Sequence, residues 1–278
     1  MRARAALLLG AAVALCGGAA SACSDPGAVC EIDGGTYHVA LPEAVEGPIP
    51  ALIWLHGYGG TGAGSLRTPT VAAPFLARGW AVIAPNGSPM AGNRAGYRWD
   101  FRGRNPDGRD DAAFLTQVRD DAAARFGLDP GQVVLGGFSN GAFMATYVAC
   151  DTPRAFTAYA PVAGTFWRPH PETCEGPVRL FQTHGWRDTT VPLEGRPLGG
   201  GRFLQGDVFE AMSIWRSANG CARPDASTTG QTDGFLLRRW SDCAEGAALQ
   251  FALFDGGHTV PKGWADLVLD WIEDAGGD

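Results

Sequence analysis

The sequence predicts an α/β fold, in which a single domain has a mostly parallel central sheet with helices on both faces. Apolar runs of strand length alternate along the chain with longer segments whose apolar residues recur at helical spacing. Strands that alternate with helices form parallel sheets, and such sheets need cover on both faces. Hydrophobic residues make up 45% of the 278 residues, which is enough for one large core, and no Pro/Gly/Ser-rich linker divides the chain.

The first predicted elements are two strands and a helix. "PALIWLHG" at 50–57 and "WAVIAP" at 80–85 are continuous apolar runs, as expected of buried strands. The segment at 110–127 opens with two acidic residues, repeats apolar residues at helical spacing and stops at Gly127. These are the start and stop signals of a helix.

The rest of the chain continues the alternation. Strands are predicted at 133–138, 156–164, 177–185 and 249–257, and helices at 141–150, 206–220 and 263–276. In parallel sheets of this kind, functional groups gather in the loops at the carboxyl ends of the strands. Those loops are therefore the places to search for a site.

Residues 1–22 have the features of a secretory signal peptide. Arg2 and Arg4 form a short positive region, "AALLLGAAVAL" is apolar but too short for a membrane span, and "ASA" is a small-residue cleavage site. A buried N-terminal helix is the alternative. We expect an exported monomer, extracellular or periplasmic, with its catalytic domain at 23–278. No later run approaches the roughly 20 apolar residues of a transmembrane helix, so we expect no membrane span.

The charge of the chain argues against nucleic acid as a partner. The formal net charge is -7, and the basic residues form no cluster that would bind phosphates or an anionic membrane. We therefore expect no nucleic-acid partner and assign the acidic charge to solubility.

The cysteines indicate disulfides. Once Cys16 in the leader is set aside, an even number remains, and in an exported chain this favours pairing. The six are Cys23, Cys30, Cys150, Cys174, Cys221 and Cys243. Many pairings are open, and we favour nearest neighbours (23–30, 150–174, 221–243) because each closes a short loop. The alternatives are a zinc site, for which the Cys and His spacing is unsuitable, and a lipid on Cys23.

A nucleophile is predicted in the bend after the strand at 133–138. Ser139 stands in the pattern Gly-x-Ser-x-Gly (137–141) between a buried strand and a helix. This arrangement is a nucleophile elbow, which lifts the serine hydroxyl clear of the sheet. Glycines at Gly137 and Gly141 avoid collisions with neighbouring backbone. The alternative is an ordinary strand–helix turn capped by the serine.

His258 is the predicted general base. A serine hydroxyl needs a base to become a nucleophile, and in this architecture the histidine comes last in the chain. His258 lies directly after the last predicted strand, at the sheet edge where Ser139 also emerges. His170 lies in a Pro-rich loop and is expected at the surface, and His184 is expected to support the loop that follows it.

Asp188 is the predicted partner of the base. It follows the strand at 177–185 and can accept the proton on the far nitrogen of His258, which fixes the tautomer. Asp207, expected at the start of a helix, and Asp255, in the histidine's own loop, are the alternatives.

Two backbone N–H groups are predicted to hold the oxyanion. One belongs to Asn140, directly after the nucleophile, and the other to Tyr58 in the loop "HGYGGTG". The alternative for the second is a glycine turn with no role in binding.

Three aromatic residues are candidates for substrate binding. Tyr97 and Trp99 alternate with arginines in "GYRWDFRGR", which follows a predicted strand and should overhang the site. They form either an aromatic wall for substrate or a loop pinned by its own aromatics, and we favour the pinned loop. Trp186, two residues from Asp188, is the stronger candidate for the pocket.

The motifs resemble those of a known family. "LHGYGGTG", "GFSNGAFMA", "FTAYAPVAG", "HGWRDTTVP", "WRSANGC" and "GGHTVP" are similar to the α/β-hydrolase superfamily, and more narrowly to secreted polyhydroxybutyrate depolymerase-like esterases, which include feruloyl and acetylxylan esterases. The resemblance implies roles in the oxyanion loop, nucleophile, acid and base for Tyr58, Ser139, Asp188 and His258. It also supports a disulfide between Cys221 and Cys243. Asn140, Trp186 and Thr259–Val260 depart from the residues frequent in this family.

We therefore expect a secreted serine esterase that acts on feruloyl, acetyl or other aryl and short-acyl esters, including those on plant polysaccharide. The alternatives are a polyhydroxyalkanoate depolymerase, a serine peptidase of the same fold and a non-catalytic binding protein on a hydrolase scaffold. The mechanism requires no metal and no organic cofactor, and the only partner expected is a small or polymeric ester.

Overall fold

The computed structural model describes residues 23, 28–44, 46–92, 94–103 and 107–274. The predicted leader at 1–22 and Arg104 of the "GYRWDFRGR" segment lie outside the described residues.

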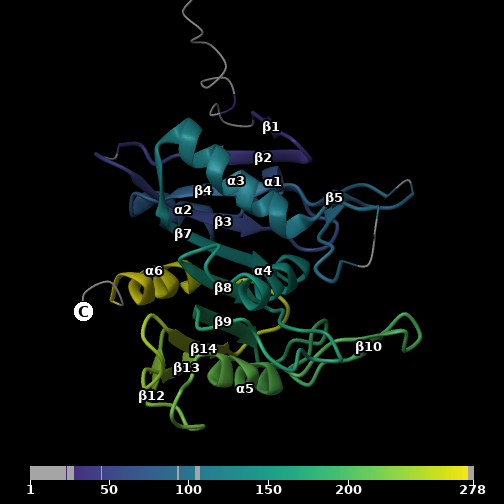
Figure 1. Cartoon of the computed structure of the whole chain (residues 1–278), viewed down its shortest axis with the longest axis vertical. Helices are drawn as coiled ribbons and strands as arrows, with labels where there is room; N and C mark the ends of the chain where they lie inside the picture. The colour runs from purple at the N-terminus through teal and green to yellow at the C-terminus, as the bar shows by residue number, and fades with distance from the viewer. Residues whose placement is uncertain (1–22, 24–27, 45, 93, 104–106, 275–278) are drawn as a thin grey trace, which may run out of the picture.

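A twisted sheet runs through the middle of the molecule (Figure 1). Within the described residues its order is β1-β2-β4-β3-β7-β8-β9-β14-β13-β12. The strands are β1 (Cys30–Ile32), β2 (Gly35–Ala40), β3 (Ile49–Leu55), β4 (Ala81–Pro85), β7 (Leu128–Phe138), β8 (Ala158–Val162), β9 (Arg179–Gly185), β12 (Thr228–Thr232), β13 (Phe235–Trp240) and β14 (Ala248–Phe254). From β4 to β14 the neighbours pair in parallel, which confirms the predicted sheet. Antiparallel strands extend both edges.

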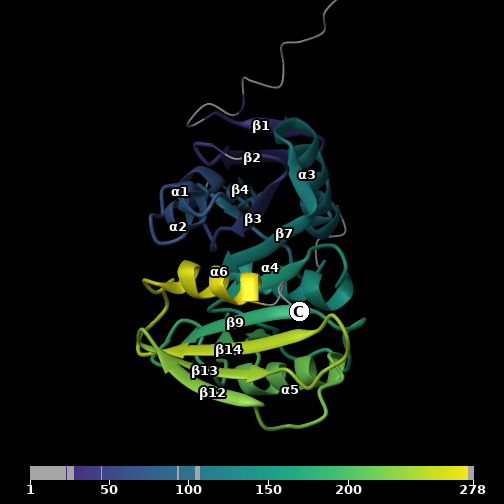
Figure 2. The ribbon, with the colours of Figure 1, turned by 90° about the vertical axis from the view of Figure 1, so that its left-hand side faces the viewer.

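Helices cover both faces of this sheet (Figure 2). One face carries α3 (Asp111–Phe126), α4 (Asn140–Asp151) and α5 (Val208–Ala218), and the other carries α1 (Gly62–Leu66), α2 (Ala72–Ala77) and α6 (Trp264–Asp274). Each face has its own apolar core: Phe114, Val148 and Trp215 belong to the first, and Phe75 and Trp264 belong to the second. This two-sided burial is why the central strands are continuous apolar runs.

The helix ends follow the signals in the sequence. Asp110 caps α3 by accepting a hydrogen bond from the N–H of Ala113, and Gly127 ends the helix in the left-handed conformation with φ 68°. Asp207 caps α5 in the same way through the N–H groups of Phe209 and Glu210. This capping role agrees with the helix-start position expected for Asp207.

Three disulfides join the nearest neighbours in sequence, as predicted: Cys23–Cys30, Cys150–Cys174 and Cys221–Cys243. Because Cys23 is bonded to Cys30, its sulfur is not free for the lipid considered as an alternative. Within the part of the chain that the structure describes, no helix has the length and apolarity needed to cross a membrane.

Two small hairpins lie on the side to which the central strands point (Figure 1). One is formed by β5 (Ser88–Pro89) and β6 (Tyr97–Arg98), and the other by β10 (Pro197–Leu198) and β11 (Phe203–Leu204). The sequence predicts neither of them. Both contribute residues to one cavity, Arg98 from β6 and Phe203 from β11.

Candidate active site

The nucleophile elbow is present at Ser139. β7 ends at Phe138, α4 begins at Asn140, and Ser139 between them has φ 55° and ψ -114°, a conformation that non-glycine residues rarely adopt. The tight turn explains the flanking glycines. A Cβ on Gly137 would lie 2.6 Å from the carbonyl of Gly141, and a Cβ on Gly141 would lie 2.3 Å from the carbonyl oxygen of Leu55.

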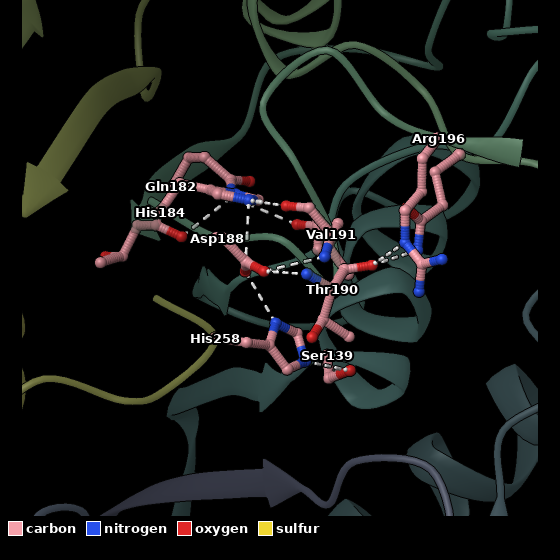
Figure 3. Close-up of polar contacts among 11 residues, drawn as sticks. Ser139, Gln182, His184, Asp188, Thr190, Val191, Arg196 and His258 are labelled. Carbon is pink, nitrogen blue, oxygen red and sulfur yellow. Dashed lines mark hydrogen bonds and ion pairs between the residues drawn. The ribbon is translucent and has the colours of Figure 1, made fainter. Parts of the chain in front are cut away.

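Three side chains that are distant in sequence meet at this turn (Figure 3). The hydroxyl of Ser139 lies 2.9 Å from Nε2 of His258, and Nδ1 of His258 lies 2.7 Å from Oδ2 of Asp188. Each residue follows the carboxyl end of a parallel strand, namely β7, β9 or β14. The structure therefore brings the predicted nucleophile, base and acid within hydrogen-bonding distance of one another.

The carboxylate of Asp188 is buried and held on both oxygens. Oδ1 accepts hydrogen bonds from the N–H groups of Thr190 (2.9 Å) and Val191 (2.8 Å), and Oδ2 accepts one from His258. Burial by itself raises the pKa of this carboxyl, but the hydrogen bonds and the nearby imidazoles outweigh it, so the pKa lies below its ordinary value. Asp188 is thus ionised at neutral pH and oriented toward the imidazole.

The alternative acids are engaged elsewhere. Asp207 caps α5. Asp255 is exposed and forms an ion pair of 2.9 Å with Arg187. The geometry therefore favours Asp188 as the partner of His258.

The remaining downstream histidines have structural contacts. His184 is fully buried, and its Nε2–H donates to the carbonyl oxygen of Val191 at 2.8 Å, so it supports the loop as predicted. Burial lowers the pKa of His184 and favours the neutral ring. The surface position predicted for His170 is wrong, because only 6% of its side chain is exposed and the ring contacts Glu210 and the Asp207 carbonyl.

The two predicted oxyanion donors border one cavity. Asn140 is the first residue of α4, where a backbone N–H has no partner within its own helix. The N–H of Tyr58 makes no hydrogen bond among the described residues. Both residues line a cavity of about 460 Å³.

The walls of this cavity are largely aromatic. Its lining consists of Tyr58, Arg98, Trp99, Asp100, Phe101, Arg102, Asn140, Trp167 and Phe203. Trp167 contacts Phe101 and Phe203, with ring centroids 5.6 Å and 5.9 Å away. Trp167 and Phe203 were not predicted from the sequence. Trp167 follows the strand β8 at the edge where the predicted site lies, so its position in the sequence could have indicated a role there. The sequence around Phe203 contains no such indication.

The three aromatics expected to bind substrate lie in different surroundings. Trp99 borders the cavity, but it is only 1% exposed and its indole N–H donates to the His56 carbonyl at 3.0 Å. Tyr97 is half-buried in β6 and pairs through its backbone with the predicted oxyanion loop. These contacts favour the pinned loop over the aromatic wall. Trp186 is 61% exposed and lines a separate apolar hollow with Leu236 and other residues.

The fold and the site define an α/β hydrolase. The chain belongs to the phospholipase/carboxylesterase family, whose model matches residues 41–198.

Three similar proteins carry the names of esterases or of a depolymerase. The chain is 24% identical over 262 residues to probable feruloyl esterase C of Aspergillus terreus, covering 90% of this chain and 86% of that protein. It is 31% identical over 157 residues to putative esterase NocK of Nocardia uniformis subsp. tsuyamanensis, and 29% identical over 133 residues to poly(3-hydroxyalkanoate) depolymerase C of Paucimonas lemoignei. These two matches cover 56% and 45% of this chain, but only 44% and 30% of the relatives.

Solved structures share the fold. The acetyl xylan esterase from Aspergillus awamori superposes with a TM-score of 0.63 at 19% identity, covering 86% of this chain and 93% of that one. The Bacillus cereus carboxylesterase gives a TM-score of 0.56 at 17% identity, with the same coverage. At these identities the likeness concerns the fold alone.

Proposed function

We propose that this chain is a secreted serine esterase with Ser139 as nucleophile, His258 as general base and acid, and Asp188 as the group that orients the imidazole. The observation that carries the proposal is the continuous chain of contacts from Asp188 through His258 to Ser139, at 2.7 Å and 2.9 Å. Both distances lie within hydrogen-bond reach, as this chemistry needs.

The proposed reaction has two steps. In the first, His258 takes the proton of Ser139 as its oxygen attacks the ester carbonyl, and the backbone N–H groups of Tyr58 and Asn140 stabilise the oxyanion. The imidazolium then gives its proton to the leaving alcohol. In the second step, His258 takes a proton from water, the hydroxide attacks the acyl-enzyme, and the acid leaves as Ser139 recovers its proton. No metal or organic cofactor takes part in this scheme.

The cavity supports aryl and short-acyl esters as substrates. A volume of about 460 Å³ lined by Phe101, Trp167 and Phe203 suits a planar aromatic acyl group such as feruloyl, and also admits acetyl. Probable feruloyl esterase C and the acetyl xylan esterase of similar fold agree with these classes by their names. Polyhydroxyalkanoate oligomers are the second candidate, because one relative is named a poly(3-hydroxyalkanoate) depolymerase.

We also propose that the chain is exported and that it is a monomer. Three disulfides are typical of chains that fold in an oxidising compartment. They support the leader predicted at 1–22 and a mature domain at 23–278 that is released outside the cytoplasm.

Hydrolysis of p-nitrophenyl acetate by the mature protein and by Ser139→Ala tests the catalytic role. The variant should lose at least roughly 10⁴-fold in kcat, whereas Ser213→Ala on α5, far along the chain from the elbow, should retain wild-type kcat. Equal, slow release of nitrophenol by wild type and Ser139→Ala would instead support a non-catalytic binding protein on this scaffold.

A panel of esters tests the substrate class. Methyl ferulate, acetylated xylan and hydroxybutyrate oligomers should rank in that order or with the first two exchanged. Phe203→Ala should raise KM for methyl ferulate several-fold and change KM for p-nitrophenyl acetate little, because only the aromatic acyl group reaches Phe203. Fastest turnover of hydroxybutyrate oligomers would select the depolymerase.

A further inference from the structure

The side chain of Asn140 forms hydrogen bonds with the backbone of another segment. Asn140 is 8% exposed. Its Oδ1 accepts a hydrogen bond from the N–H of Trp99 at 2.7 Å, and its Nδ2 donates to the carbonyl oxygen of Trp99 at 3.3 Å. The amide thus pairs with both peptide groups of one residue, as a neighbouring strand would. A residue directly after the nucleophile is in this way tied to a residue 41 positions earlier.

The segment bound by Asn140, which contains Tyr97 and Trp99, is in turn hydrogen-bonded to the predicted oxyanion loop. The indole N–H of Trp99 donates to the carbonyl oxygen of His56 at 3.0 Å, and the two rings lie 5.1 Å apart. Two residues earlier, Tyr97 accepts a hydrogen bond from the N–H of Gly59 at 2.8 Å and donates to the carbonyl oxygen of Gly60 at 3.0 Å. The loop is therefore fixed at His56, Gly59 and Gly60, and Tyr58 lies between these fixed points.

The contact between the two segments is also tight. A Cβ on Gly96 would lie 2.1 Å from the carbonyl oxygen of Gly59. The backbone of one segment therefore rests directly on the other, so a shift of Trp99 is transmitted to the loop rather than absorbed by side chains.

We infer that the Asn140 side chain is a positioning group that couples the two oxyanion donors. Its backbone N–H is one donor, and its carboxamide holds the segment on which the loop with the other donor, Tyr58, is built. This inference rests on the proposed esterase function. It assigns to Asn140 a role beyond supplying an N–H, which any residue at this position would supply.

The physical consequence is a loss of preorganisation when the carboxamide is removed. An oxyanion donor acts only if it is already aimed at the place where charge develops, and removal of one donor typically costs about 10²- to 10³-fold in kcat. Asn140→Ala keeps the backbone N–H groups of Tyr58 and of residue 140 but removes the two hydrogen bonds to Trp99. The loop that carries Tyr58 is then held less firmly. The expected loss in kcat is therefore smaller, roughly 10- to 100-fold, with KM within about twofold of wild type.

The experiment compares Asn140→Ala with Thr146→Val. Thr146 lies on the same helix, is fully buried and donates its hydroxyl to the Ala142 carbonyl at 2.8 Å, so the control also removes a buried side-chain hydrogen bond. kcat and KM are measured with p-nitrophenyl acetate, together with the inhibition constant of phenylboronic acid, whose tetrahedral adduct on Ser139 uses the same donors. Asn140→Ala should lower kcat and raise the inhibition constant in proportion, whereas Thr146→Val should change only thermal stability.

Trp99→Phe provides an independent test that does not depend on the folding of the first variant. It removes the indole N–H that bonds to His56 while keeping a smaller aromatic ring, so it should lower kcat through the same loop. The double variant should then lose less than the product of the two single losses. Wild-type kcat in Asn140→Ala, fully multiplicative losses, or a fall in kcat without a change in boronic acid inhibition would overturn the inference. The proposed function would still stand in each of these cases, because only Ser139→Ala tests it.

Discussion

Acid should destabilise this protein through His56, a histidine outside the proposed catalytic group. His56 is 3% exposed, its Nδ1–H donates to the Gly57 carbonyl at 2.8 Å, and its Nε2 accepts the N–H of Gly87 at 3.1 Å. A proton on Nε2 would face that N–H and break the bond. Burial is the largest cause that lowers the pKa of His56 from 6.5 to about 4, and the charge of Arg109 lowers it further, against the opposing effect of the bond to Gly57.

The sign and size of the effect follow from these pKa values. Below pH 6.5 the unfolded chain binds a proton at His56 and the folded chain does not. The free energy of unfolding therefore decreases as the pH is lowered from 6.5 to about 4. Between pH 7.5 and 4.5 this amounts to about 2.5 kcal/mol. The lowered pKa of His184 acts in the same direction. The lowered pKa of Asp188 removes stability only below its unfolded value, outside this range.

Urea unfolding at pH 7.5 and 4.5 measures the effect. The difference in free energy of unfolding between the two pH values should shrink by about 2.5 kcal/mol in His56→Gln, whatever that variant costs at neutral pH. Asn86→Ala is the matched control, because the Asn86 side chain accepts the N–H of Gly62 at the start of α1 but does not titrate. It should lower stability equally at both pH values. An unchanged pH difference in His56→Gln would refute the reasoning.

Three further outcomes are expected. Asp188→Asn should lower kcat roughly 10⁴-fold with little change in KM, because the amide no longer fixes the tautomer of the base. Gly141→Ala should cost about 3 kcal/mol or more in urea unfolding, since its Cβ would lie 2.3 Å from the Leu55 carbonyl oxygen. Removal of the Cys221–Cys243 bridge by a double serine substitution should lower stability by about 3 kcal/mol, because it opens a loop of 22 residues. Thermal stability unchanged in the last variant would contradict the entropic account.

The meeting of Ser139, Asp188 and His258 was predictable because each directly follows a strand of the parallel sheet. Carboxyl ends of parallel strands share one edge, so strand order alone brings the three loops together. The sequence shows these strands as apolar runs because helices bury both faces. The same reasoning placed Tyr58 and Asn140 at that edge.

The antiparallel strand β12 at one edge of the sheet had no comparable signal in the sequence. β12 is polar and mostly exposed. It is a strand because it pairs with β13, which itself pairs with β14. Such strands depend on tertiary pairing rather than on their own periodicity. The hairpin of β10 and β11 is formed for the same reason, around a tip of three glycines with positive φ.

The sequence also does not show which aromatic side chains of the loops are buried. A tryptophan in a loop is equally consistent with a buried support and an exposed platform until its N–H has a partner. In Trp99 the indole N–H finds the His56 carbonyl and the ring is buried, whereas Trp186 remains exposed beside another hollow. The sequence neighbours of the two residues do not distinguish these outcomes.

Part of the cavity wall lies in other segments of the chain than the predicted nucleophile, base and acid. Ser139, Asp188 and His258 follow strands of the sheet, whereas Trp167 lies in the segment after β8 and Phe203 lies in β11. Trp167 pairs with Gln205, the residue directly after β11. We expect substitutions in that pair of segments to change the shape of the cavity without moving the elbow. Asn140 is the exception, because its side chain joins a cavity wall to the nucleophile turn. We expect a change at Asn140 to lower the rate for every acyl group, because it disturbs the positioned N–H groups. Acyl specificity should therefore be adjustable at Phe203 but not at Asn140.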